Sequence, residues 1–144
     1  MNLTRGVTRY IFREVQVNLV TGIGIDTVDV VSFRKRLDDR LIEELFLPAE
    51  IEYCLSQVRY WENFAARFAA KEAAFKALGS GLSSGLRFRD VEIVKNNKTG
   101  SISIRLHGKA LAVQIEKRIE RVLVSVSHTR ISAVAIVVAE DKSV

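Results

Sequence analysis

The chain has 144 residues, of which 48% are apolar and 27% charged, and its formal net charge is +5. This length predicts one domain that is large enough to fold without a metal or disulfide staple. The single cysteine, Cys54, excludes an internal disulfide and suits a reducing compartment, so we expect a cytoplasmic protein. Residues 1–18 lack the apolar core of a signal peptide, and no apolar run is long enough to span a membrane.

The first half of the chain predicts one strand and three helices. Residues 1–16 are expected to be a flexible extension, which leaves 17–144 as the folded domain. A strand over 15–25 is followed by a helix over 27–40, and Pro48 suits the first turn of a helix that ends near Gln57. The clearest helix covers 61–78, where one face collects Phe64, Phe68, Phe75 and Leu78, and where Gly79 follows at the position that commonly ends helices.

The second half predicts four strands and one helix. Alternating residues favour strands over 88–95 and 101–106, joined by a hairpin turn, and two more over 122–127 and 133–139. Between these pairs, residues 108–119 predict a helix with Leu111, Ile115 and Ile119 on one face. We expect the four strands to form one antiparallel sheet packed on helices, which is a compact α+β domain.

The positive charge favours an anionic partner. Arg34, Lys35, Arg36 and Arg40 form a basic cluster on the helix predicted after Asp26. Such a cluster is either a solvated face or a dock for an acidic protein. Nucleic acid is disfavoured, since the net charge is modest and basic and aromatic residues do not interleave.

Two carboxylates and nearby cations suggest a phosphate-transfer site. Asp26 ends an apolar strand, where it either caps the next helix or faces a metal, and Asp29 fits the first turn of that helix. Glu72 and Lys76 are one helical turn apart, and both Glu72 and Lys71 flank the phenylalanine face. Mg²⁺ typically takes one or two carboxylates together with phosphate oxygens and water, so Asp26 and Glu72 suffice. The cations that could neutralise phosphate charge are Arg67, Lys71 and Lys76.

Ser127 and His128 lie at the predicted end of a strand. Adjacent Ser and His do not ordinarily form a nucleophile–base pair, so a Ser/His hydrolase is disfavoured. We therefore expect His128 to contact a phosphate or the backbone at the turn.

Three motifs together resemble holo-[acyl-carrier-protein] synthases, the small trimeric 4′-phosphopantetheinyl transferases. They are Gly22-Ile-Gly-Ile-Asp26, Arg67-Phe-Ala-Ala-Lys-Glu-Ala-Ala-Phe-Lys-Ala-Leu-Gly79 and Val124-Ser-Val-Ser-His-Thr129, in the family's order. The resemblance implies transfer of the phosphopantetheine arm of coenzyme A to a serine of an apo acyl carrier protein, releasing adenosine 3′,5′-bisphosphate. It also implies the transferase fold and a homotrimer with active sites between subunits.

The resemblance assigns roles by position. It matches Asp26 and Glu72 to ligands of Mg²⁺, for which Mn²⁺ is an alternative, and Lys76 to the lysine near the pyrophosphate. Glu72, directly or through a metal-bound water, is the candidate base. Contacts to coenzyme A are expected from Arg67, Lys71, Lys76 and His128, and carrier docking from Arg34, Arg36 and Arg40.

One position departs from the family pattern. Ser32 stands where the family usually has a docking arginine, so Arg34 or Arg36 is expected to replace it. The alternative to an enzyme is a non-catalytic basic module that binds an acidic protein or nucleic acid.

Overall fold

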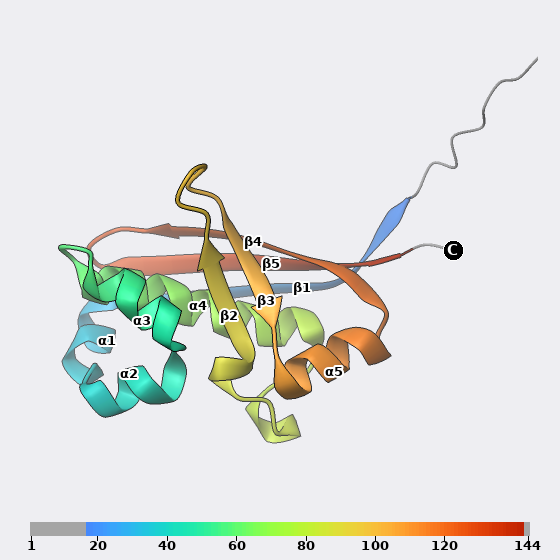
Figure 1. Cartoon of the computed structure of the whole chain (residues 1–144), viewed down its shortest axis with the longest axis horizontal. Helices are drawn as coiled ribbons and strands as arrows, with labels where there is room; N and C mark the ends of the chain where they lie inside the picture. The colour runs from blue at the N-terminus through green and yellow to red at the C-terminus, as the bar shows by residue number, and fades with distance from the viewer. Residues whose placement is uncertain (1–16, 143–144) are drawn as a thin grey trace, which may run out of the picture.

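The computed structural model describes residues 17–142, and the predicted extension at 1–16 lies outside this range. The described elements, in chain order and including two short 3₁₀ helices (η), are β1 (Asn18–Asp29), α1 (Val30–Arg36), α2 (Asp39–Leu45), α3 (Pro48–Leu55), α4 (Tyr60–Leu78), η1 (Leu82–Ser84), η2 (Phe88–Asp90), β2 (Val91–Lys95), β3 (Ile102–Leu106), α5 (Gly108–Glu116), β4 (Ile119–His128) and β5 (Ser132–Lys142). The predicted α+β class is confirmed (Figure 1).

The long strands form a three-stranded antiparallel sheet in the order β1-β5-β4. The hairpin of β2 and β3 is a separate two-stranded sheet that runs across the direction of the long strands (Figure 1). The expectation of one sheet made from the last four strands was therefore wrong. The first strand, β1, pairs with β5 on the side that β4 leaves free. The sequence did not predict this pairing, because residue alternation indicates a strand but not which strand lies beside it.

Helix α4 packs directly against β1 because two glycines let the backbones approach. A side chain at Gly22 would overlap the carbonyl oxygen of Ala77, and one at Gly24 would overlap that of Ala73. Two residues along a strand and four along a helix both span about 6–7 Å. The spacing of the two glycines therefore matches the spacing of Ala73 and Ala77, and both contacts can form together. This contact brings the end of β1 beside the part of α4 that carries Glu72 and Lys76.

The helix predicted over 27–40 is two helices. Strand β1 continues to Asp29, whose carboxylate accepts a hydrogen bond from the Ser32 backbone N–H at 2.7 Å and caps α1. Asp38 caps α2 in the same way through the N–H of Leu41, at 2.8 Å. Asp29 is thus the cap, and Asp26, for which capping was one of two predicted roles, lies within the strand opposite Ala135.

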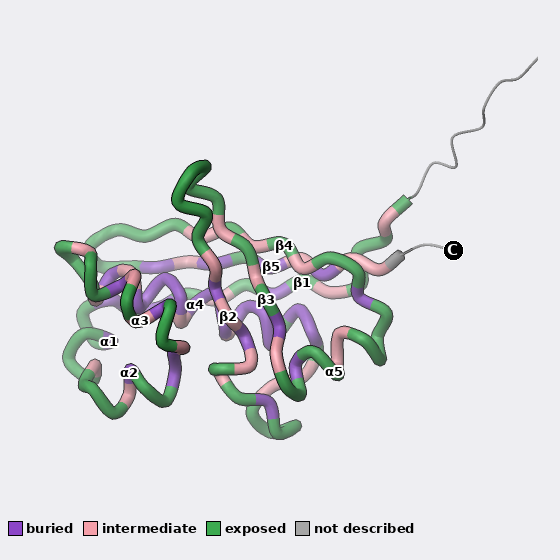
Figure 2. Tube along the Cα trace, in the orientation of Figure 1, coloured by how far each residue is buried: buried purple, intermediate pink, exposed green. Residues whose placement is uncertain are grey.

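Two smaller predictions also change, whereas α3 and α4 agree with the sequence. Residues 88–90 form the 3₁₀ helix η2 instead of the start of a strand. In α5, Leu111 and Ile115 are exposed, and it is Ala110 that is buried. Ile119 belongs to β4. The reason is that α5 lies at the edge of the molecule, where only a narrow face meets its neighbours (Figures 1 and 2).

The core lies between α4 and one face of the long sheet. Small and β-branched residues of β5, from Ala133 through Val137 to Ala139, are buried there. Cys54 is also fully buried, and burial raises the pKa of its thiol to about 12, as expected for an unreactive cysteine. Within residues 17–142, no helix is both long and apolar enough to cross a membrane.

The opposite face of the long sheet is apolar and uncovered. Ile23, Ile25, Leu123 and Ile136 are exposed on it, and the register places Ile23 and Leu123 on either side of Val138. Figure 2 shows the exposed stretches along β1 and β4. Contiguous exposed apolar residues of this kind mark interaction surfaces.

Candidate functional site

The end of β1 and the outer side of α4 enclose a hollow of about 390 Å³. We call it the acidic hollow, and the residues used below are Asp26, Ser32, Arg36, Phe68, Glu72 and Lys76. The three residues predicted for catalysis and metal binding, Asp26, Glu72 and Lys76, therefore meet in one place although β1 and α4 are far apart in sequence.

Lys76 joins the two elements. Its Nζ lies 3.1 Å from Oδ1 of Asp26 and donates a hydrogen bond of 2.8 Å to the carbonyl oxygen of Ile25. The Lys76 side chain is still about half exposed, at 53%, so its ammonium can reach a bound anion. The spacing of Glu72 and Lys76 is typical of an ion pair within the helix, whereas Lys76 forms its ion pair with Asp26 on the strand.

Glu72 is half-buried, and its pKa is raised above the ordinary 4.5. Burial is the largest cause, the negative charge of Asp26 adds to it, and Lys76 opposes both. A raised pKa makes a carboxylate a stronger base. Two carboxylates that repel each other also favour binding of a cation between them.

Arg67 and His128 line a different hollow, of about 460 Å³, which lies between α4, β4 and the β2–β3 hairpin. We call it the basic hollow. Arg67 is buried, its guanidinium lies 4.3 Å from the centre of the Tyr53 ring, and its Nε has no hydrogen-bond partner. Arg67 and Glu72 are five residues apart, which is about 140° around an α-helix, so one chain presents them on different faces.

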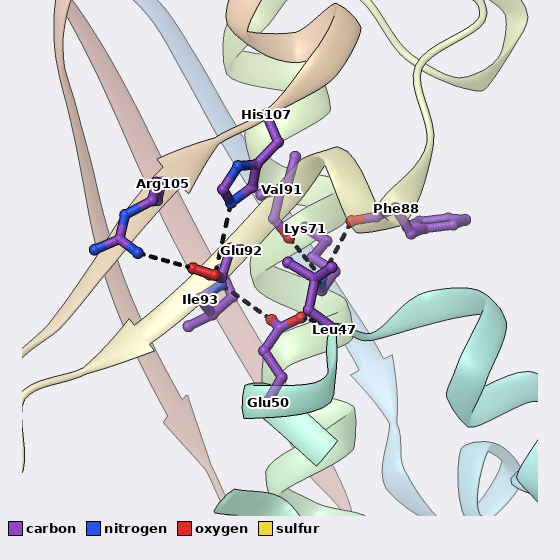
Figure 3. Close-up of polar contacts among 9 residues, drawn as sticks. All are labelled: Leu47, Glu50, Lys71, Phe88, Val91, Glu92, Ile93, Arg105 and His107. Carbon is purple, nitrogen blue, oxygen red and sulfur yellow. Dashed lines mark hydrogen bonds and ion pairs between the residues drawn. The ribbon is translucent and has the colours of Figure 1, made fainter. Parts of the chain in front are cut away.

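The structure places Lys71 in neither hollow. Its side chain is fully buried, and Nζ lies 2.9 Å from Oε2 of Glu50 and donates to the carbonyl oxygens of Phe88, at 3.1 Å, and Val91 (Figure 3). All three of its N–H groups are thereby used. We leave Lys71 out of the proposed coenzyme A contacts, because a buried and saturated ammonium has no donor left for a phosphate.

Glu50 completes this buried network. Its carboxylate also accepts hydrogen bonds from the backbone N–H of Leu47, at 2.8 Å, and Ile93, at 3.0 Å. Figure 3 shows Glu50 and Lys71 between α3, α4 and β2, with the pair of Glu92 and Arg105 beside them. Burial lowers the pKa of Lys71, and Glu50 acts against this.

The arginines of the predicted basic cluster, Arg34, Arg36 and Arg40, do not share one surface site. The Arg34 guanidinium lies 3.5 Å from the centre of the Trp61 ring, where it holds α1 against α4. Arg36 lines the acidic hollow together with Ser32, the position where the family pattern has arginine. Arg36 and Arg40 also border an apolar hollow that contains Phe33 and Phe68.

Glu62 is a residue that the sequence interpretation missed. It is 5% exposed, and its carboxylate lies 3.3 Å from Nδ1 of His128. An acid that falls on the buried side of a mostly apolar helix is a signal that could have been noticed, since such residues are rarely buried without a partner.

A family model described as the 4′-phosphopantetheinyl transferase superfamily matches residues 22–134. The chain belongs to this superfamily. The holo-[acyl-carrier-protein] synthase of Geobacter sulfurreducens is 44% identical over 125 residues, covering 85% of this chain and 98% of that protein. The predicted family and enzyme class are confirmed.

Solved structures agree on the fold of this transferase. Holo-ACP-synthase from Plasmodium yoelii has a TM-score of 0.77 at 27% identity and covers 89% of this chain and 100% of its own. The synthase from Bacillus anthracis, solved in complex with CoA (3′,5′-ADP), has a TM-score of 0.71 at 30% identity. The match covers 88% of this chain and 100% of the Bacillus anthracis chain.

Proposed function

We propose that this transferase moves the 4′-phosphopantetheine arm of coenzyme A to a serine of an apo acyl carrier protein. The observation that carries the proposal is the meeting of Asp26, Glu72 and Lys76 in the acidic hollow of a chain from this superfamily. The serine oxygen forms a bond to the phosphorus that bears the arm, and the bond from that phosphorus to adenosine 3′,5′-bisphosphate breaks.

Glu72 and Lys76 handle the proton and the charge. As a carboxylate, Glu72 accepts the serine hydroxyl proton, directly or through a water, and its raised pKa suits this task. Lys76 holds its ammonium at the mouth of the hollow, where it stabilises the negative charge on the departing phosphate. Positioning of the serine against the pyrophosphate supplies much of the remaining acceleration.

Asp26 and Glu72 would hold a divalent cation, Mg²⁺ or alternatively Mn²⁺. Burial raises the pKa of Glu72 most and the nearby Asp26 carboxylate raises it further, and these two facing carboxylates are the observation that fits such an ion. Among residues 17–142, no three His, Cys, Asp or Glu side chains cluster as ligands, so phosphate oxygens and water would complete the shell. When bound, the ion neutralises pyrophosphate charge.

Coenzyme A contacts are assigned to Lys76 in the acidic hollow and to Arg67 and His128 in the basic hollow. These residues lie on different faces of one chain, which supports active sites between subunits of a homotrimer. The uncovered apolar sheet face is the surface that such an assembly would bury. We place the reaction in the cytoplasm, with neither membrane nor nucleic acid as a partner.

The trimer predicts a simple result in solution. Light scattering at micromolar concentration should report three chains, and Ile23→Lys should release monomers, because it puts a charge on the apolar sheet face. Val58→Lys is the control, since Val58 is 93% exposed and lies in the loop between α3 and α4. A wild-type monomer would contradict the proposal.

Carrier docking is assigned to Arg36 and Arg40, with Arg34 beside them. Arg36 stands one helical turn after Ser32 and lines the acidic hollow, so it is better placed than Arg34 to replace the family's arginine. Arg34 is already engaged with Trp61. Arg36 and Arg40 both border apolar surface, and a positive charge beside apolar surface suits an acidic, amphipathic helix.

Intact-protein mass spectrometry tests the reaction. The full chain is mixed with apo acyl carrier protein, coenzyme A and Mg²⁺, and a parallel sample contains EDTA. We expect a gain of one phosphopantetheine on the carrier that EDTA prevents. No gain with a panel of carriers would contradict the proposal and favour the non-catalytic binding module.

A further inference from the structure

Glu62 forms a pair with His128, and the reaction described above gives Glu62 no role. Glu62 lies in the first turn of α4, and His128 is the last residue of β4. The side chain of Glu62 is 6% exposed, and that of His128 is 35% exposed. The pair thus joins a buried carboxylate to an imidazole at the surface of the basic hollow.

The buried carboxylate needs a partner that donates a hydrogen bond or carries a positive charge. One neighbour is Arg59, whose guanidinium nitrogen lies 3.9 Å away and whose side chain is 46% exposed. Nδ1 of His128 is nearer, at 3.3 Å. Because burial of an unpaired carboxylate is costly, His128 is the partner that Glu62 holds.

The contact between Glu62 and Nδ1 of His128 determines the direction and the protonation of the other ring nitrogen, Nε2. The two nitrogens of an imidazole point in different directions, so Nε2 is turned away from Glu62. Which nitrogen carries the proton is set by the group that the other one contacts. His128 lines the basic hollow together with Arg67 and Asn63, so a ligand bound there would lie beside the His128 ring.

We propose that Glu62 is a positioning residue: it holds His128 by Nδ1, so that Nε2 is presented to an anionic group of coenzyme A in the basic hollow. When the anion binds, the ring carries a proton on each nitrogen, so that Nδ1–H donates to Glu62 and Nε2–H donates to the anion. This inference rests on the proposed function, because it deepens the part of His128 in binding coenzyme A. His128 is paired with Ala133 of β5 and Glu62 is buried, so the fold fixes the backbone at both ends of this contact. The carboxylate stays behind the ring and does not repel the anion directly.

A double-mutant cycle tests the proposal with coenzyme A as the varied substrate. In metal sites, loss of a carboxylate that orients a histidine costs about 10- to 100-fold in affinity, and we expect a smaller rise in KM here, of about five- to tenfold, for Glu62→Ala. The value of kcat should stay within about twofold, because the pair does not touch the reacting atoms. In the His128→Ala background, Glu62→Ala should leave KM nearly unchanged.

Two further measurements separate positioning from folding. Glu62→Gln keeps an oxygen acceptor for Nδ1 and should recover much of the wild-type KM. Because the chain has two histidines, the ¹⁵N spectrum of the imidazoles is simple, and His128→Ala assigns it. In neutral His128 we expect the proton on Nδ1 in the wild type and a shift toward Nε2 in Glu62→Ala.

The outcomes are distinct. An equal rise in KM in both backgrounds, or no change of the ¹⁵N spectrum in Glu62→Ala, would overturn the pairing. If the wild-type chain neither bound coenzyme A nor modified a carrier, the proposed function would fail. The ¹⁵N spectrum would then still decide whether Glu62 holds His128.

Discussion

Replacing Glu72 by glutamine is expected to lower kcat for phosphopantetheine transfer by about 10²- to 10⁴-fold, the usual contribution of a general base. The substitution also removes one of the two carboxylates proposed to hold the cation. At the same time the melting temperature should stay equal or rise. Loss of activity without loss of stability would identify Glu72 as a functional residue.

The expected melting temperature of Glu72→Gln follows from the raised pKa of Glu72. Burial and Asp26 make the folded chain hold a proton on Glu72 more tightly than the unfolded chain does. The stability linked to this proton is therefore present at low pH and is lost as the pH rises through the folded pKa, which lies above 4.5. At neutral pH the ionised carboxylate opposes folding, and the neutral amide does not.

The same pKa shift predicts an acid limb in the activity of the wild type. As the pH falls through the pKa of Glu72, kcat/KM should decline, with a midpoint above the ordinary 4.5. Glu116→Gln, which removes an exposed carboxylate from α5, is the matched control and should change neither activity nor melting temperature. Full activity in Glu72→Gln would refute its assigned role.

Replacing Lys71 by methionine is expected to cost about 3–5 kcal/mol of the free energy of unfolding, the usual result of removing one partner of a buried ion pair. The substitution leaves the Glu50 carboxylate buried without a counter-charge. It also removes the donor that the carbonyl oxygens of Phe88 and Val91 share. Urea unfolding at a fixed protein concentration measures the effect.

The same helix offers the control. Lys76→Met breaks the Asp26 pair at an exposed position and should cost at most about 1 kcal/mol. The double variant Lys71→Met with Glu50→Gln should be more stable than Lys71→Met alone, because no buried charge is then left unpaired. Equal unfolding curves for Lys71→Met and Lys76→Met would show that the buried network is not a stabilising element.

The two lysines show how far sequence reasoning reached. Lys71 and Lys76 lie in one motif, and a helical wheel placed Lys71 beside the phenylalanine face. The wheel describes which side of α4 a residue occupies but not what packs there. Glu50, 21 residues before Lys71, and the carbonyl oxygens of Phe88 and Val91 pack against that side of α4 and bury the Lys71 ammonium.

The paired carboxylates were easier to anticipate. The strand that carries Asp26 and the helix that carries Glu72 and Lys76 are both visible as local patterns. The close contact of Gly22 and Gly24 with α4 then makes their approach possible. By contrast, the pairing of Glu62 with His128 joins residues 66 positions apart, and no local pattern links them.

The sequence by itself determined the family, the α+β class, most helix and strand positions and three residues of the acidic hollow, Asp26, Glu72 and Lys76, because these depend on local spacing and on motifs. Only the tertiary structure decided the pairing of β1 with β5, the burial of Lys71 and the separation of Arg67 and His128 from Glu72. These features depend on which distant segments share an interior, and burial sets whether a charged group is a structural partner or is free to meet a substrate.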